Sequence, residues 1–138
     1  MLGVLHSRQD CLLSSGQIAE AAQLTQATAA KVIKALVAAE LVRTQRGIRG
    51  GCQLSRPVSR ISIAEVVEAI EGPIALTACV DGAEEPCSVQ QGCFMGGNWN
   101  RVNTALREAL LSVSLADLFD PASLFPDPAS AQQIQTRT

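Results

Sequence analysis

Hydrophobic residues recur at helical spacing along most of this chain, and two such segments lie close together near its start. Residues 16–22 form the first segment, and Ser14 or Ser15 can cap it. The second extends from Thr25, another capping residue, to about Glu40. Two short helices joined by a few residues predict a helix-turn-helix. The apolar positions of the second helix follow the spacing of one helix face: Ala29, Val32, Ile33, Leu36 and Val37.

A β-hairpin is predicted directly after this pair of helices. Residues 41–44 favour a short strand, residues 45–51 a glycine-rich basic turn, and residues 52–55 a return strand. Pro57 ends the hairpin, because proline cannot donate to a strand ladder. A hairpin in this place is the wing of a winged helix.

A third helix is predicted beyond the hairpin. Ser62 and Glu65 are spaced as a capping box for a helix over residues 63–71, and Gly72 and Pro73 end it. The positions expected to face inward are Ile63, Val66, Val67 and Ile70.

A long amphipathic helix is predicted to begin with Asn98 as its cap and to run from Trp99 to about Val113. Its apolar stripe needs a partner face, and a second copy of the same helix supplies one by two-fold symmetry. The sequence therefore predicts a homodimer. The stripe consists of Trp99, Val102, Leu106, Ala109, Leu110 and Val113.

These elements predict a mainly α protein: a winged helix-turn-helix with a small β-hairpin wing, a cysteine loop and a long C-terminal dimerisation helix. No apolar run is long enough to span a membrane and no secretory signal is evident, so we expect a cytoplasmic protein. The expected divisions are a DNA-binding domain whose first helix is truncated (1–72), a cluster-binding loop (73–97), the dimerisation helix (98–119) and a disordered tail (120–138).

Charge is divided sharply along the chain, although the net charge is only −2. Residues 25–60 hold seven basic residues and one acid, a balance of +6, whereas residues 61–93 hold six acids and no base. DNA binding requires a local basic surface rather than a basic protein overall. We therefore favour a hairpin that binds DNA over a hairpin whose arginines are merely solvated. The expected contacts lie on the second helix and the wing: Thr28, Lys31, Lys34, Arg46 and Arg49.

Three cysteines, Cys79, Cys87 and Cys93, lie in the acidic, glycine-rich loop of residues 77–97. Five cysteines without a secretory signal favour metal or redox chemistry over a disulfide framework. Thiolates are soft donors for iron and zinc, and structural zinc sites use closely spaced cysteine pairs. The wider spacing here favours an iron–sulfur cluster over three unrelated thiols.

A fourth ligand is not evident from the sequence. His6, the only histidine, is expected to be a surface or capping group, and Cys11 and Cys52 can be small hydrophobic residues. An oxygen ligand, a thiol from solution or a residue of the second protomer could complete the site.

Several strings of this sequence together resemble the winged-helix regulators typified by IscR and NsrR. They are LVRTQRGIRGG at residues 41–51, IAEVVEAIEGP at residues 63–73, and the three loop cysteines. Residues 71–79, 97–103 and 114–118 are similar to the SUF-system iron–sulfur assembly regulators within that family.

The resemblance implies a homodimer that binds a double-stranded DNA operator and controls iron–sulfur assembly genes. It implies a 2Fe-2S cluster, favoured here over 4Fe-4S, held by the three loop cysteines. It places Thr25, Thr28 and Lys31 against the DNA groove and Arg46 in the minor groove. We expect a repressor, with activation left open.

The chain departs from the family pattern in three places. Family members carry further residues before the position of Met1, which in some relatives include an acidic ligand for the partner's cluster. Gly96 stands where some relatives place a histidine ligand. Cys52 replaces an aromatic residue, which is expected to loosen the wing or add a thiol.

Two other functions stay open. A cluster-free thiol switch would regulate transcription through a disulfide between two loop cysteines, and assays of iron and acid-labile sulfide separate it from a cluster protein. A small cluster carrier without DNA binding is the other, and the +6 segment argues against it. No enzyme is expected, because the sequence shows no acid–base pair, phosphate loop or nucleophile–histidine pairing.

Overall fold

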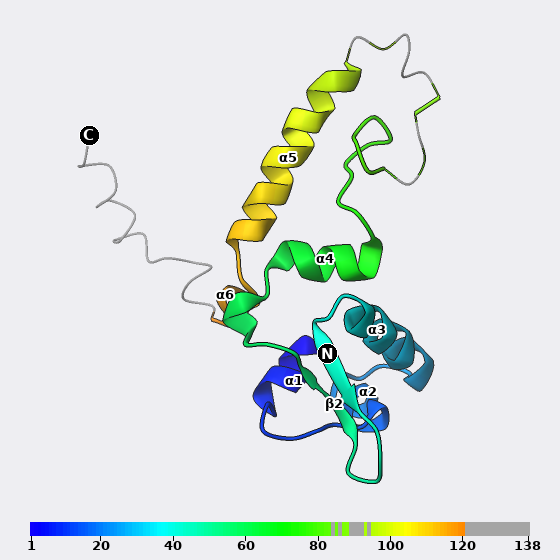
Figure 1. Cartoon of the computed structure of the whole chain (residues 1–138), viewed down its shortest axis with the longest axis vertical. Helices are drawn as coiled ribbons and strands as arrows, with labels where there is room; N and C mark the ends of the chain where they lie inside the picture. The colour runs from blue at the N-terminus through cyan, green and yellow to red at the C-terminus, as the bar shows by residue number, and fades with distance from the viewer. Residues whose placement is uncertain (84, 86, 89–92, 94, 121–138) are drawn as a thin grey trace, which may run out of the picture.

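The computed structural model describes residues 1–83, 85, 87, 88, 93 and 95–120. Figure 1 shows α1 to α3 and the hairpin at one end of the molecule, α4 lying across them, and α5 extending away with the cysteine loop beside it. The elements are α1 (Leu2–Ser7), α2 (Ser15–Ala21), α3 (Gln26–Ala38), β1 (Val42–Gln45), β2 (Gly51–Leu54), η1 (Val58–Arg60), α4 (Ile63–Glu71), α5 (Gly96–Ser112) and α6 (Leu115–Phe119).

The helix-turn-helix forms as the sequence predicts. Ser14, rather than Ser15, caps α2 and makes a reciprocal capping box with Gln17. Thr25 caps α3 by accepting a hydrogen bond from the Thr28 amide. The inner face of α3 is the predicted one, with these residues buried or packed at its edge: Ala29, Val32, Ile33, Leu36 and Val37.

The predicted wing is confirmed, because β1 and β2 pair antiparallel with Val42 opposite Leu54. Leu13 anchors the hairpin to the body by exchanging two backbone hydrogen bonds with Cys52, of 3.1 and 2.7 Å. A Cβ on Gly51 would lie 2.8 Å from the Leu13 carbonyl oxygen, so this close approach requires glycine.

The core lies between the helix pair, the hairpin and the start of α6, and it is aliphatic. Cys52 belongs to it: the residue is 6% exposed, and burial raises the pKa of its thiol. It therefore acts as a small hydrophobic residue that stays protonated. The other buried members are Leu5, Leu13, Ile18, Ile33, Leu36, Leu41, Val42, Val58, Ile61 and Leu115.

α4 has its predicted bounds and its predicted capping box of Ser62 and Glu65. Hydrogen bonds from Ser62, together with the ion pair to Arg56, lower the pKa of Glu65. The inward position expected for Ile70 is wrong, since its side chain is 42% exposed. Ala64 is the only fully buried residue of α4. The other apolar side chains of this helix are therefore only partly covered by the described residues.

α5 begins at Gly96, preceded by Met95, and has no side-chain cap. The predicted capping role of Asn98 is therefore wrong, because Asn98 already lies inside the first turn. Among the described residues of α5, no apolar side chain is fully buried, and Val102 is 48% exposed. The buried residue is Asn103, at 8% exposure. The apolar stripe predicted for a partner is thus partly open.

α6 turns the chain back onto the winged helix. Ser114 caps it in a box with Asp117 and forms an isolated β-bridge with Ser62. His6 stacks on Phe119 with ring centroids 5.2 Å apart and 9° between the planes. His6 therefore packs α1 against α6, whereas the sequence led us to expect a surface or capping group.

The predicted disordered tail falls outside the described residues, apart from Asp120. The longest described helix, α5, has 17 residues. In the part of the chain that the structure describes, no helix combines the length and apolar character needed to cross a membrane.

Candidate DNA interface and cysteine site

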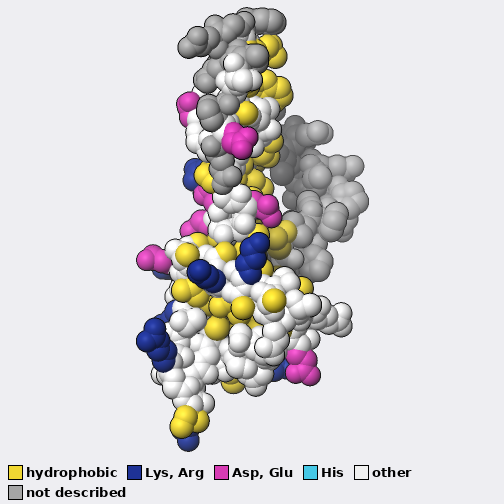
Figure 2. Space-filling view, turned by 90° about the vertical axis from the view of Figure 1, so that its right-hand side faces the viewer, with side chains coloured by type: hydrophobic (Ala, Val, Ile, Leu, Met, Phe, Trp, Pro, Cys, Tyr) yellow, Lys and Arg dark blue, Asp and Glu magenta, His cyan; other side chains and the backbone are white. Residues whose placement is uncertain are grey.

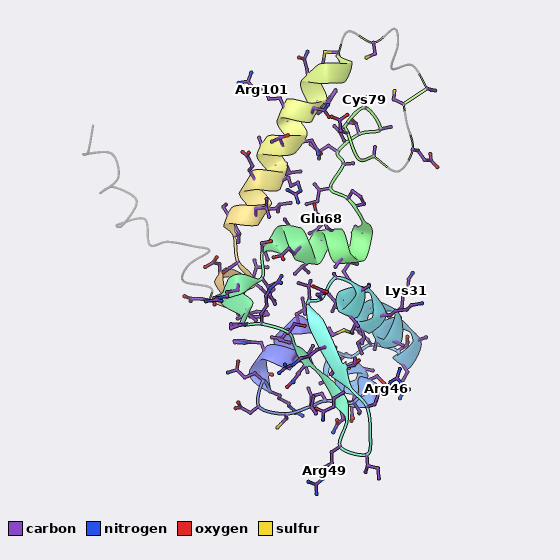
Figure 3. The ribbon with its side chains drawn as sticks, in the orientation of Figure 1. Lys31, Arg46, Arg49, Glu68, Cys79 and Arg101 are labelled. Carbon is purple, nitrogen blue, oxygen red and sulfur yellow. The ribbon has the colours of Figure 1, made fainter. Side chains whose placement is uncertain are left out.

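The outer side of α3 presents the residues predicted to meet DNA. Thr28, Lys31 and Lys34 are exposed, and Figure 3 shows Lys31 pointing away from the helix. Thr25 is exposed as well, but its hydroxyl accepts from the Thr28 amide at 3.2 Å and lies 2.9 Å from the Thr28 hydroxyl. Thr25 therefore fixes the start of α3 in addition to any contact with DNA.

Arg46 and Arg49 are exposed on the wing, with Arg49 at its tip and Arg46 higher, on the side near α2 and α3 (Figure 3). The tip is closed by a 2.9 Å hydrogen bond from the Gly50 amide to the Gly47 carbonyl oxygen. Gly47 has a φ of +113°, and a Cβ on Gly50 would lie 2.2 Å from the Gln45 carbonyl oxygen. Both glycines are required for this turn, which keeps the tip narrow enough to approach a DNA groove.

The basic side chains of the helix-turn-helix and the wing differ in whether they bind another protein group. Arg43 donates to the Gln53 side-chain oxygen across the hairpin at 2.7 Å, and Arg56 pairs with Glu65. Figure 2 shows Lys and Arg side chains mostly over the lower half of the molecule, with most Asp and Glu above. Within the described residues, no hydrogen bond or ion pair engages the side chains of Lys31, Lys34, Arg46 and Arg49.

The three loop cysteines are partly buried, and their thiols interact. A hydrogen bond with the Cys87 thiol raises the pKa of Cys79, with smaller increases from burial and from the charges of Cys87 and Cys93, while Thr77 lowers it. The Cys87 amide donates to the Ala78 carbonyl oxygen at 3.2 Å. The loop therefore folds Cys87 back beside Cys79.

Two asparagines of α5 fasten the loop to the helix. Asn103 donates to the Ile74 carbonyl oxygen at 2.8 Å and accepts from the Leu76 amide at 3.0 Å. Asn100 donates to the Asp81 carboxylate at 2.9 Å and accepts from the Asp81 amide at 2.8 Å. The two asparagines lie three residues apart on one helix face, so the stretch with the first loop cysteine runs along α5 (Figure 3).

An ion pair joins α5 to α4. Arg107 donates to the Glu68 carboxylate at 2.8 and 3.4 Å, and the hydrogen bond with Glu68 raises the pKa of Arg107. An exposed pair of this kind adds little to stability, because solvent screens the two charges. α4 in turn packs against α3, so contiguous contacts lead from the cysteine loop through α5 and α4 to α3.

Among the residues that the structure describes, no three His, Cys, Asp or Glu side chains form a group that could hold a metal ion. The other candidate ligands lie apart: Cys11 is exposed, Cys52 is in the core, and His6 is stacked on Phe119.

The sequence profile of the Rrf2 family, described as iron-dependent transcriptional regulators, matches residues 1–121. The chain belongs to the Rrf2 family. The HTH-type transcriptional regulator NsrR of Oceanobacillus iheyensis is 33% identical over 102 residues, which cover 74% of this chain and 69% of that protein. The family expected from the sequence is thereby confirmed, and with it a DNA-binding transcription regulator.

Solved structures confirm the winged-helix fold of this Rrf2 protein. CymR of B. subtilis, described as its global cysteine regulator, has a TM-score of 0.59 and 23% identity, and the match covers 91% of this chain and 88% of CymR. IscR of T. potens has a TM-score of 0.58 and 23% identity, covering 99% of this chain and 84% of that one. These likenesses concern the fold.

Sequence reasoning missed the side chains that hold the loop of this Rrf2 protein. Asn100 and Asn103 were not among the predicted site residues, although a signal for them existed. Asparagine is a poor helix former, so one in the middle of an amphipathic helix indicates a partner for its amide. The ion pair of Arg107 with Glu68 joins residues 39 positions apart, and no local pattern reveals it.

Proposed function

We propose that this Rrf2 protein senses iron–sulfur status through a cluster bound by Cys79, Cys87 and Cys93. The observation that carries this proposal is geometric: the Cys87 amide bonds to the carbonyl next to Cys79, in a loop that Asn103 fastens to α5. A 2Fe-2S cluster is favoured over 4Fe-4S, and an oxygen atom or a residue of a second protomer would complete the ligand set. The similarity to SUF-system regulators points to iron–sulfur assembly genes as the targets.

DNA recognition is proposed to follow the exposed cations. α3 would lie in the major groove with Thr28, Lys31 and Lys34 against the duplex, and Arg46 would enter the neighbouring minor groove from the wing. The stripe of α5 would pair with its copy in a homodimer, so that two α3 helices face two half-sites of the operator.

The route from loop to DNA is proposed to run through α5. When bound, the cluster supplies iron–thiolate bonds that restrain the loop cysteines. Asn103 and Asn100 transmit the position of the loop to α5, and Arg107 links α5 to Glu68 of α4. Because α4 packs against α3, the loop would shift the equilibrium between arrangements of the two recognition helices.

A thiol switch is the second candidate, and the interaction of Cys79 with Cys87 favours it. Two thiols this close can give up two protons and two electrons to an oxidant such as a peroxide and form a disulfide. The loop would then be restrained by a sulfur–sulfur bond in place of iron, with the same contacts to α5.

Anaerobic purification followed by visible spectroscopy and assays of iron and sulfide tests the cluster. We expect a coloured protein with equal amounts of iron and acid-labile sulfide. Cys87→Ala is expected to remove most of the visible absorption, whereas the matched change Cys11→Ala, at an exposed cysteine outside the loop, leaves it unchanged. A colourless wild-type protein after chemical reconstitution would favour the thiol switch, and an unchanged Cys87→Ala spectrum would refute the ligand assignment.

A further inference from the structure

Ile48 has the greatest exposure of the large hydrophobic side chains in the described residues, at 107%. With Arg49 it occupies the two central positions of the turn that the Gly50-to-Gly47 hydrogen bond closes. Such positions ordinarily take glycine, proline, asparagine, aspartate or serine. The Ile48 side chain buries no apolar surface within this molecule, so we look for a contact with another molecule.

The surroundings of Ile48 indicate what that contact is. Arg49 is its neighbour in the turn and Arg46 lies just before the turn, and the side chain of neither makes a hydrogen bond or ion pair within the described residues. Figure 2 shows hydrophobic and basic side chains together at the lower end of the molecule. Arginines are drawn to the negative potential of a narrow minor groove, and proteins that bind there commonly insert an apolar side chain between base steps.

Backbone contacts define the shape of the tip. Its turn is closed by a hydrogen bond, and a Cβ on Gly50 would collide with backbone atoms of Gln45, Arg46 and Gly47. Apart from the adjoining residues, no heavy atom lies within 4 Å of the Cβ position of Gly47, so one side of the tip is open for an approaching duplex.

We propose that Ile48 is an apolar wedge that contacts the floor of the operator minor groove between Arg46 and Arg49. The wedge would favour a flexible pyrimidine–purine step, which unstacks at the least cost. The inference rests on the proposed insertion of the wing into the minor groove. A protein partner is less suited to this tip, because one isoleucine offers too small an apolar area for an interface core.

Duplex DNA selected by the anaerobically purified full chain from a randomised pool supplies the probe. Ile48→Ser is expected to lower affinity about tenfold for each half-site of this duplex, the scale of burying one isoleucine side chain. The salt dependence of binding should stay the same, since no phosphate contact is lost. Ile48→Leu keeps the apolar volume and should bind within about threefold of wild type. Both variants should melt at the wild-type temperature.

A second selection tests specificity. The pool selected by the wild type should share a pyrimidine–purine step under the wing, and the pool selected by Ile48→Ser should lose it. Equal affinities and equal pools would overturn the wedge while leaving DNA binding intact. Failure of the wild type to select any duplex would instead overturn the proposed function. Loss of self-association in Ile48→Ser with unchanged DNA affinity would assign the tip to a protein contact and overturn the wedge.

Discussion

At the scale of single residues, the arginines of the hairpin and of the helix contacts differ in what they hold. Arg43, Arg56 and Arg107 each hold a neighbouring side chain. Arg46 and Arg49 are exposed on the wing without such a partner in the described residues. An arginine that holds no protein group keeps its full charge available for a phosphate or a groove, which is why the wing is the expected site of electrostatic contact.

Arg46→Ala is expected to weaken operator binding about tenfold for each half-site and to reduce the salt slope by about 1.8 per dimer, because one counterion-releasing contact is lost in each protomer. Arg101→Ala is the matched control, since Arg101 is exposed on α5, far from the wing (Figure 3). Fluorescence anisotropy over a range of salt concentrations measures both quantities. Wild-type affinity and slope in Arg46→Ala would refute the role of the wing.

At the scale of elements, most of the winged helix was predictable because its signals are local. Ser62 and Glu65 lie three residues apart, and Thr25 directly precedes the helix that it caps. The start of α5 was not, because Asn98 is a good capping residue by type but the helix begins earlier, at Gly96. The exposure of Ile70 was not predictable either, because periodicity defines the apolar face of a helix but does not show which residues cover that face.

The candidate site was predictable only in part, because the sequence shows residue types but not long-range contacts. The cysteines and basic residues are visible as residue types, whereas the contacts of the loop with α5 join residues far apart in sequence. Asn103 accepts from an amide 27 positions away. Long-range pairs of this kind depend on the packing of whole helices, so only the structure reveals them.

Asn103→Ala is expected to lower the free energy of unfolding by about 1–3 kcal/mol, because the Leu76 amide and Ile74 carbonyl lose their partner in a partly buried place. Hydrogen exchange at the Leu76 amide should accelerate. Asn98→Ala, at an exposed position of the same helix, should change stability by about 0.5 kcal/mol or less. Urea denaturation and exchange measurements provide the test. Equal behaviour of the two variants would mean that Asn103 does not fasten the loop.

At the scale of the whole molecule, the chain has a basic end, which is the proposed DNA-binding end, and a long helix whose apolar stripe is only partly covered. The apolar stripe of α5 is partly open, with Val102 48% exposed. A helix that exposes an apolar stripe on a protein of this size is stabilised by burying it against a partner. Dimerisation through α5 would also set the distance between the two recognition helices.

Val102→Glu is expected to convert the proposed dimer largely to monomer, because a carboxylate would be buried without a partner in an apolar seam. Thr104→Glu makes a comparable change on another side of α5 and should leave the dimer intact. Sedimentation velocity at equal concentrations distinguishes the two outcomes. A dimer that survives Val102→Glu would place the interface elsewhere.

The central claim is that the cysteine loop controls DNA binding, and operator affinity with and without the cluster tests it most directly. The anaerobic protein would be titrated against its selected duplex, treated with an iron chelator and titrated again, with iron and sulfide assayed at both stages. We expect the two affinities to differ about fivefold or more, and Cys87→Ala to bind as the iron-free protein does at both stages. Equal affinities before and after verified cluster removal would contradict the account.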